Sequence, residues 1–318
     1  MKYIDLFAGI GGFRLALDSI GFKCVFSSEI NKHCQDVYFN NYNELPYGDI
    51  TKINPKDIPD FDILCAGFPC QPFSTSGLRK GFEDTRGTLF FNICSIIKEK
   101  QPKVILLENV YGLIIHDKGK TFKIICKTIE DLGYKISYKI LNAKDFGVPQ
   151  NRERIIIIAA QDYFEFNTLY LNSYVRIKDI LDKDNKFLNK SEYTLIDKKY
   201  WKSDGLNFVG YLNKNTRKGT DSNLNLSRAH RQPNRIYSID GIHPTISSQE
   251  TSGRFFIYLP EIDEVRKLTI NECYKLMGFP ANFKKSNIIG EAYKQIGNSV
   301  CVPMIKEVGR QIKIQLLS

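Results

Sequence analysis

Membrane-spanning segments are missing from this sequence. No hydrophobic run in its 318 residues approaches the roughly 18 apolar residues that a membrane-spanning helix needs. Residues 1–7 also lack the basic-then-apolar layout of a secretory signal peptide. With 42% apolar and 25% charged residues, the composition is that of an ordinary globular protein, which we expect to be cytoplasmic.

Paired metal ligands are missing as well. The eight cysteines include no Cys-x-x-Cys pair, and no histidine stands at ligand spacing from them. A zinc site needs such pairs and a disulfide framework needs a secretory setting, so we expect neither a metal nor disulfides. Cysteines such as Cys24, Cys65 and Cys94 lie in apolar runs, where small buried thiols are common. Only Cys70 requires another explanation.

Most of the net charge of +10 comes from one segment. From Lys198 to Arg235, nine lysines and arginines stand against only Asp204 and Asp221, so the segment carries +7. A segment of this kind is either a solvated basic surface or a surface that follows phosphates. Charge alone does not decide between them.

Short apolar runs alternate with helical segments over the first 160 residues. This alternation predicts an α/β fold with a Rossmann-like, mostly parallel sheet and helices on both faces. Helices are expected at 13–20 and 89–100. The candidate strands are 3–7, 24–28, 62–66, 104–108, 135–142 and 154–159.

The composition changes from about residue 165, where Asn, Lys, Ser and Asp become frequent. We expect a smaller, irregular or β-rich domain over 165–280. Helical segments return at 269–277 and 305–316. We expect the last of these to pack on the first domain, which then consists of 1–164 and 281–318.

Three features at the ends of the first strands indicate a nucleoside-containing cofactor. Glycines at 9, 11 and 12 lie in a strand-to-helix turn, where backbone can approach a ligand closely near a helix N-terminus. Glu29 follows the second strand and can accept hydrogen bonds from both hydroxyls of a ribose. Asp49 is placed to accept a hydrogen bond from an adenine amino group. These features alone do not choose between NAD and S-adenosylmethionine.

Residues with reactive side chains lie at the ends of three other strands. Cys70 lies between two prolines in a stiff loop beyond the strand 62–66, where a nearby cation or helix N-terminus would favour its thiolate. Glu108 ends the strand 104–108, and a partly desolvated carboxyl group there could be protonated near neutral pH and donate to a ring nitrogen. Arg152 and Arg154 enter the strand 154–159 in alternate positions and suit a carbonyl oxygen or a phosphate.

With these residues in place, the chain resembles the DNA (cytosine-5) methyltransferases of bacterial and phage restriction-modification systems over nearly its whole length. The fold implied is that of the class I S-adenosylmethionine-dependent methyltransferases, with the smaller domain serving in target recognition. The matching blocks occur in the order of that family: residues 7–12, Glu29, Asp49, 69–74, 81–93, 108–110, 150–154, 266–280 and 293–300.

The resemblance implies that Cys70 attacks carbon 6 of cytosine while Glu108 protonates or hydrogen-bonds ring N3. Arg154 would hold the cytosine O2, and Arg152 would support Arg154 or contact a phosphate. S-adenosylmethionine is the implied cofactor. The implied cofactor-binding residues are Phe7, Ala8, Gly9, Ile10, Gly11, Gly12, Glu29, Ile30, Asp49, Ile50, Gly67, Pro69, Leu89, Asn298 and Ser299.

The implied substrate is double-stranded DNA, from which the target base must be flipped out. Ser76 and Arg79 lie in the loop after Cys70, Gln232 resembles a residue that fills the vacated space, and Thr245 resembles one beside the flipped nucleotide. The +7 segment then supplies phosphate contacts. Within it or at its end, Arg228, Arg231 and Arg235 address either guanine edges or phosphates.

Other functions stay open at this point. The RNA-modifying branch of the same family typically carries a Cys-Phe-Thr element in the second domain, whereas no cysteine occurs here between Cys126 and Cys273. A nicotinamide-dependent oxidoreductase or a catalytically silent DNA-binding module would leave the reactive loops without a purpose. We expect a monomer that protects DNA from a cognate restriction endonuclease, or else an orphan methylase without such a partner.

Overall fold

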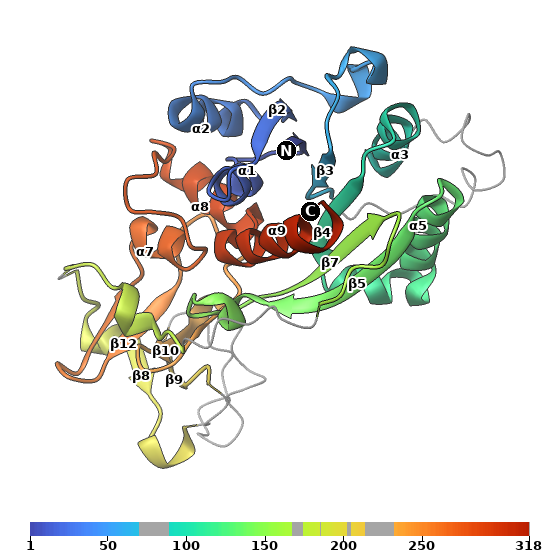
Figure 1. The fold of residues 1–318 in the computed structure, drawn as a ribbon. Coiled ribbons are helices and arrows are strands. Elements are labelled where there is room, and N and C mark those ends of the chain that lie inside the picture. The colour runs from blue at the N-terminus through green and yellow to red at the C-terminus, as the bar shows by residue number, and fades with distance from the viewer. Residues whose placement is uncertain (70–88, 167–173, 185, 202–204, 214–231, 318) are drawn as a thin grey trace. The chain divides into compact units, whose positions relative to one another are not determined.

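The computed structural model describes residues 1–69, 89–166, 174–184, 186–201, 205–213 and 232–317 (Figure 1). The chain forms two compact units. Unit 1 comprises 1–142, 153–170 and 299–318, and unit 2 comprises 143–152 and 171–298. Residues 143–152 and 281–298, which the sequence analysis assigned to the first domain, thus belong to unit 2. The short strand β6 (Gln150–Asn151) pairs there with β11 (His243–Pro244).

Unit 1 is built on a six-stranded sheet with the order β2-β1-β3-β4-β7-β5. The first four of these strands are mutually parallel, while β7 runs antiparallel to both β4 and β5. The predicted Rossmann-like, mostly parallel sheet is confirmed. The strands are β1 (Lys2–Leu6), β2 (Lys23–Ser28), β3 (Ile63–Ala66), β4 (Val104–Val110), β5 (Lys135–Asn142) and β7 (Glu153–Ala160).

Helices cover both faces of this sheet. Helices α3 (Leu89–Lys100) and α5 (Lys120–Asp131) share one apolar core with Ile4 and Leu6 of β1. Tyr3, whose side chain alternates with these, donates a hydrogen bond to Asp18 of α1 (Gly12–Asp18) at 2.8 Å. The opposite face therefore carries α1. The C-terminal helix α9 (Val302–Leu316) packs against α1 within unit 1. Two further helices of unit 1 are α2 (Lys32–Tyr42) and α4 (Gly112–Ile115).

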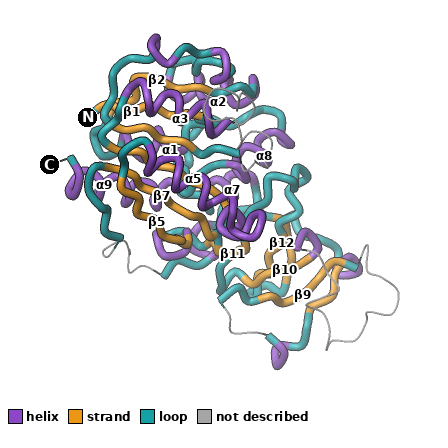
Figure 2. The backbone as a smooth tube through the Cα atoms, turned by 90° about the vertical axis from the view of Figure 1, so that its right-hand side faces the viewer, coloured by secondary structure: helices purple, strands orange, loops and turns teal. Residues whose placement is uncertain are grey.

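Unit 2 contains a second sheet with the order β13-β12-β10-β9-β8, of which Figure 2 labels β12, β10 and β9. Only the β10–β12 pair is parallel. This sheet confirms that the second domain is β-rich, and helices α7 (Ile270–Lys275) and α8 (Ile289–Asn298) belong to the same unit. The strands are β8 (Tyr193–Leu195), β9 (Phe208–Leu212), β10 (Arg235–Ser238), β12 (Phe256–Leu259) and β13 (Glu264–Lys267).

A buried ion pair joins β13 to α7. Both terminal nitrogens of Arg266 contact the Glu272 carboxylate, at 2.7 and 2.8 Å, and neither side chain is accessible to solvent. Glu272 also accepts from the backbone N–H of Thr269, whose hydroxyl in turn caps the helix. The first part of the block 266–280 thus stabilises the interior of unit 2. None of the helices in the described ranges is long and apolar enough to cross a membrane.

Candidate active site

The glycine turn (residues 7–12) leaves β1 and enters α1 through left-handed backbone. Phe7, Gly9 and Gly11 have φ values of 58°, 56° and 85°, a region that favours glycine. The side chains of Ala8 and Ile10 are buried, so the turn presents mainly backbone. This is the geometry in which a ligand can approach the start of a helix closely.

Glu29 is held against the glycine turn. One carboxylate oxygen accepts from the N–H of Gly9 at 2.8 Å, and the other accepts from the N–H of Asn31 at 2.7 Å. The next side chain, Ile30, is 71% exposed. Glu29 can therefore accept hydrogen bonds from the hydroxyl groups of a ligand. The exposed Ile30 side chain can contact an apolar face of the same ligand.

Asp49 follows a segment that is fixed beside Glu29, because the chain at Tyr47 hydrogen-bonds to the end of β2. The Tyr47 N–H donates to Ser27 and its carbonyl accepts from the N–H of Glu29, both at 2.8 Å. Asp49 Oδ1 accepts from the N–H and hydroxyl of Thr51, and these bonds lower the pKa of Asp49. The carboxylate is therefore ionised at neutral pH. The neighbouring Ile50 side chain is buried.

Glu108 and Arg154 meet at the ends of two paired strands. Arg154 Nε lies 3.0 Å from Glu108 Oε1, and each side chain is only 10% exposed. Burial lowers the pKa of Arg154, and the Glu108 carboxylate acts in the opposite direction. A Cβ placed on Gly67, beyond β3, would lie 3.7 Å from Glu108 Oε2. The carboxyl group therefore sits between Arg154 and the chain that leads to Cys70.

Asn109 ties that chain to β4. Its Nδ2 donates to the carbonyl of Phe68 at 2.9 Å, and its Oδ1 accepts from the N–H of Val110. Phe68 stands two positions before Cys70, which itself lies outside the described residues, as do Ser76 and Arg79. No role was predicted for Asn109, although it directly follows Glu108.

We expect Asn109→Ala to lower kcat by about 10- to 100-fold, because the chain entering the Cys70 loop loses its anchor. Asn109→Asp keeps the volume and the oxygen that accepts from Val110, but it lacks the donor to Phe68. It should be as slow as Asn109→Ala in single-turnover methyl transfer with saturating DNA. An Asn109→Asp variant as fast as the wild type would show that the donor is dispensable.

Arg152 has a different environment from Arg154. It is 1% exposed and donates to the carbonyl oxygens of Ile246 and Gly297, at 3.3 and 3.0 Å. All three residues belong to unit 2. These contacts brace the backbone of that unit.

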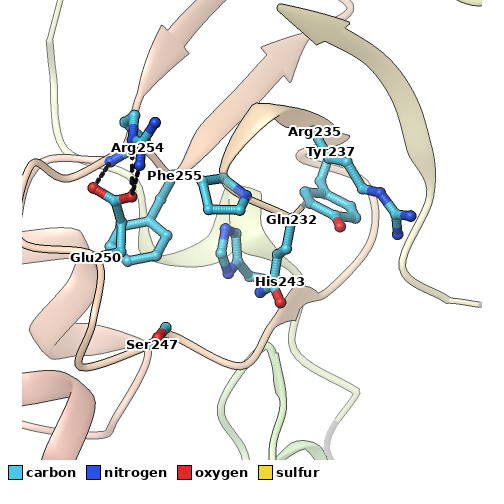
Figure 3. Close-up of a pocket in the computed structure, with 9 residues that line it drawn as sticks. Gln232, Arg235, Tyr237, His243, Ser247, Glu250, Arg254 and Phe255 are labelled. Atoms are coloured by element: carbon cyan, nitrogen blue, oxygen red, sulfur yellow. Dashed lines mark hydrogen bonds and ion pairs between the residues drawn. The ribbon is translucent and has the colours of Figure 1, made fainter. Parts of the chain in front are cut away.

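Gln232, one of the predicted DNA-binding residues that the structure describes, lines a cavity of about 150 Å³ in unit 2 (Figure 3). Gln232 Nε2 donates to the Thr245 carbonyl at 2.8 Å, and the Thr245 hydroxyl donates to the carbonyl of Asn151 at 2.8 Å. Arg235 also lines the cavity. Arg228 and Arg231 lie outside the described residues.

Two further features of this cavity were not predicted. Arg254 is oriented by two contacts of 2.8 Å to the buried carboxylate of Glu250, as Figure 3 shows. His243 is 1% exposed, its Nδ1 lies 2.7 Å from the Pro244 carbonyl, and burial lowers its pKa to about 4. The imidazole is therefore neutral at physiological pH.

The other predicted cofactor-binding residues are spread over several elements. Gly12 is the first residue of α1, and Leu89 is the half-buried first residue of α3. Gly67 is half-buried and Pro69 is exposed. Asn298 ends α8 in unit 2, whereas Ser299 begins the last segment of unit 1.

Burial raises the pKa of most of the other cysteine thiols that the structure describes. It raises the pKa of Cys24 and Cys94 to about 12 and that of Cys126 to about 11, and it also raises the pKa of Cys65 and Cys273. These thiols are protonated at neutral pH, and a protonated thiol is a poor nucleophile.

The sequence of this chain matches that of a known protein family. The family model for C-5 cytosine-specific DNA methylases matches residues 1–314. The Type II methyltransferase M.HhaI of Haemophilus parahaemolyticus is 42% identical, over 98% of this chain and 94% of its own length. M.SsoII of Shigella sonnei, another Type II methyltransferase, is 44% identical over 98% of this chain and 79% of its own.

Solved structures agree on the fold. The Entamoeba histolytica methyltransferase EhMeth superposes with a TM-score of 0.70 at 21% identity, covering 100% of this chain and 99% of its own. A family model that spans nearly the whole chain, together with relatives above 40% identity, settles its membership. The chain belongs to the family of C-5 cytosine-specific DNA methylases.

Proposed function

We propose that this enzyme transfers the methyl group of S-adenosylmethionine to carbon 5 of a cytosine within a specific double-stranded DNA sequence. The observation that carries the proposal is the buried Glu108–Arg154 pair beside the chain that leads to Cys70. It joins a carboxyl group, which can pass a proton to N3, to a guanidinium, which can bind O2, and attack on a cytosine ring requires both.

The residues around the glycine turn fit S-adenosylmethionine, which when bound supplies the methyl group. We assign the ribose hydroxyls to the anchored Glu29 carboxylate and the adenine amino group to the ionised Asp49. The exposed Ile30 side chain offers an apolar surface for the adenine ring. We assign the remaining part of S-adenosylmethionine to the backbone of the glycine turn.

Cys70 and Glu108 act on the cytosine itself. The Cys70 thiolate forms a bond to carbon 6, the ring electrons move toward N3, and N3 takes a proton from Glu108. Arg154 holds the O2 oxygen, where negative charge develops. The resulting enamine is nucleophilic at carbon 5, which the aromatic ring is not. Once carbon 5 has been methylated, loss of its proton to a base expels the Cys70 thiolate, and N3 returns its proton to Glu108.

The target base reaches Cys70 only after it leaves the duplex. We assign Gln232 to the space that the base vacates, and Thr245 to the backbone beside it. Their mutual hydrogen bond supports this pairing of roles. The basic segment that ends at Arg235 contacts phosphates, so DNA affinity falls as salt is added.

The relatives above 40% identity are named as Type II methyltransferases. We therefore propose that this enzyme protects DNA from a cognate restriction endonuclease. An orphan methylase would carry out the same reaction without such a partner.

Methyl transfer from radiolabelled S-adenosylmethionine to duplex DNA and to transfer RNA tests the proposal directly. We expect labelled DNA only, and bisulfite sequencing of DNA from cells that express the enzyme should then show one methylated sequence. Labelling of RNA alone would contradict the proposed substrate and favour the RNA-modifying branch of the family.

A further inference from the structure

A buried polar cluster stands behind the glycine turn, on the face of the sheet that carries α1. Its centre is Arg14, whose guanidinium donates to the Tyr38 hydroxyl at 3.1 Å and to Asp18 at 3.3 Å, and also contacts Glu44. The charge lies 5.4 Å from the ring centre of Tyr38 and 4.8 Å from that of Tyr42. Both tyrosines come from α2.

Only one of the two tyrosines reaches the glycine turn by a hydrogen bond. The Tyr42 hydroxyl donates to the carbonyl of Gly11 at 2.7 Å. The same carbonyl accepts from the N–H of Leu15 at 2.9 Å, the bond that opens α1. A Cβ on Gly11 would overlap the Tyr42 ring, so the ring lies directly on the turn. The Tyr38 hydroxyl instead accepts a hydrogen bond from the Arg14 guanidinium.

Two side chains thus hold the glycine turn. Glu29 accepts from the N–H of Gly9 on one side, and Tyr42 donates to the carbonyl of Gly11 on the other. We infer that Tyr42 is a positioning residue for the methyl donor: its hydroxyl holds the left-handed turn in the shape that binds the donor. This rests on the proposed cofactor site. Tyr42 itself touches neither the donor nor the cytosine in this assignment.

Tyr42→Phe and Tyr38→Phe form a matched pair. Each removes one phenolic hydroxyl from the same cluster and keeps its ring beside Arg14, but only Tyr42→Phe releases Gly11. We expect both variants to melt within about 4 °C of the wild type, because each loses only a phenolic hydroxyl and keeps its ring in the cluster. Calorimetry should show a Kd for S-adenosylmethionine raised by about 3- to 10-fold in Tyr42→Phe and unchanged in Tyr38→Phe.

Amide hydrogen exchange of the ligand-free protein gives a second readout. Exchange of the amides in residues 8–15 should be faster in Tyr42→Phe than in the wild type and unchanged in Tyr38→Phe. At saturating S-adenosylmethionine, kcat of Tyr42→Phe should equal that of the wild type.

Unchanged Kd and exchange in Tyr42→Phe, or equal losses in both variants, would overturn the inference. If the wild type itself binds no S-adenosylmethionine, the proposed cofactor is wrong. Amide exchange in residues 8–15 then still decides whether Tyr42 holds the turn.

Discussion

Replacement of Cys70 with serine is expected to abolish methyl transfer, with a fall in rate of at least about 10⁴-fold. The serine hydroxyl is almost fully protonated at neutral pH and is a far weaker nucleophile than a thiolate. Without the bond to carbon 6, carbon 5 of the ring does not become reactive. DNA that carries 5-fluorocytosine at the target shows this directly, since fluorine at carbon 5 blocks the elimination that releases the enzyme. The wild type should form a stable covalent complex and Cys70→Ser none.

Cys126→Ser is the matched control. Cys126 is a half-buried thiol on α5 whose pKa is raised to about 11, so we expect it to stay protonated and unreactive. Its variant should form the complex at the wild-type rate. A covalent complex with Cys70→Ser would show that another group is the nucleophile, whereas loss of the complex in both variants would point to damage to the fold.

Local patterns predicted the elements of unit 1 closely. The helix expected at 89–100 and the strand at 135–142 are observed with the same bounds, as α3 and β5. In α3 the buried side chains Phe90, Ile93, Cys94 and Ile97 repeat at helical spacing, which makes the pattern readable. Helix α2 was not predicted, because Val37 and Tyr38 are its only buried side chains among eleven residues.

The sequence also indicated the strand ends at which the candidate site is assembled. The resemblance implied that Glu108 and Arg154 contact the same cytosine, and the structure places them 3.0 Å apart. The contacts of Asn109 and Tyr42 span 41 and 31 residues and carry no local signal. The hydrogen-bond partners of Arg152 could not be predicted from the sequence either. Alternation with Arg154 suggested a shared direction, yet its carbonyl partners come from residues about 94 and 145 positions later.

The second large effect is expected for Glu108→Gln, which should lower the rate of covalent complex formation and kcat by about 10²- to 10⁴-fold. Glutamine has nearly the same shape and can still accept from Arg154 through its carbonyl oxygen, so the fold should be retained. It can donate a hydrogen bond to N3 but cannot transfer a proton. The anion left on the ring after attack by Cys70 is then stabilised only by hydrogen bonds, and the barrier to attack rises.

Glu153→Gln provides the control, because it makes the same chemical change at an exposed residue next to Arg154 on β7. Arg154 uses only the backbone carbonyl of Glu153, at 2.7 Å, so this variant should react at the wild-type rate. The measurement is single-turnover methyl transfer with saturating DNA and S-adenosylmethionine, which separates chemistry from binding. A Glu108→Gln enzyme with wild-type single-turnover rates would show that proton transfer to N3 is not needed. In that case the charge of Arg154 on O2 would have to activate the ring alone.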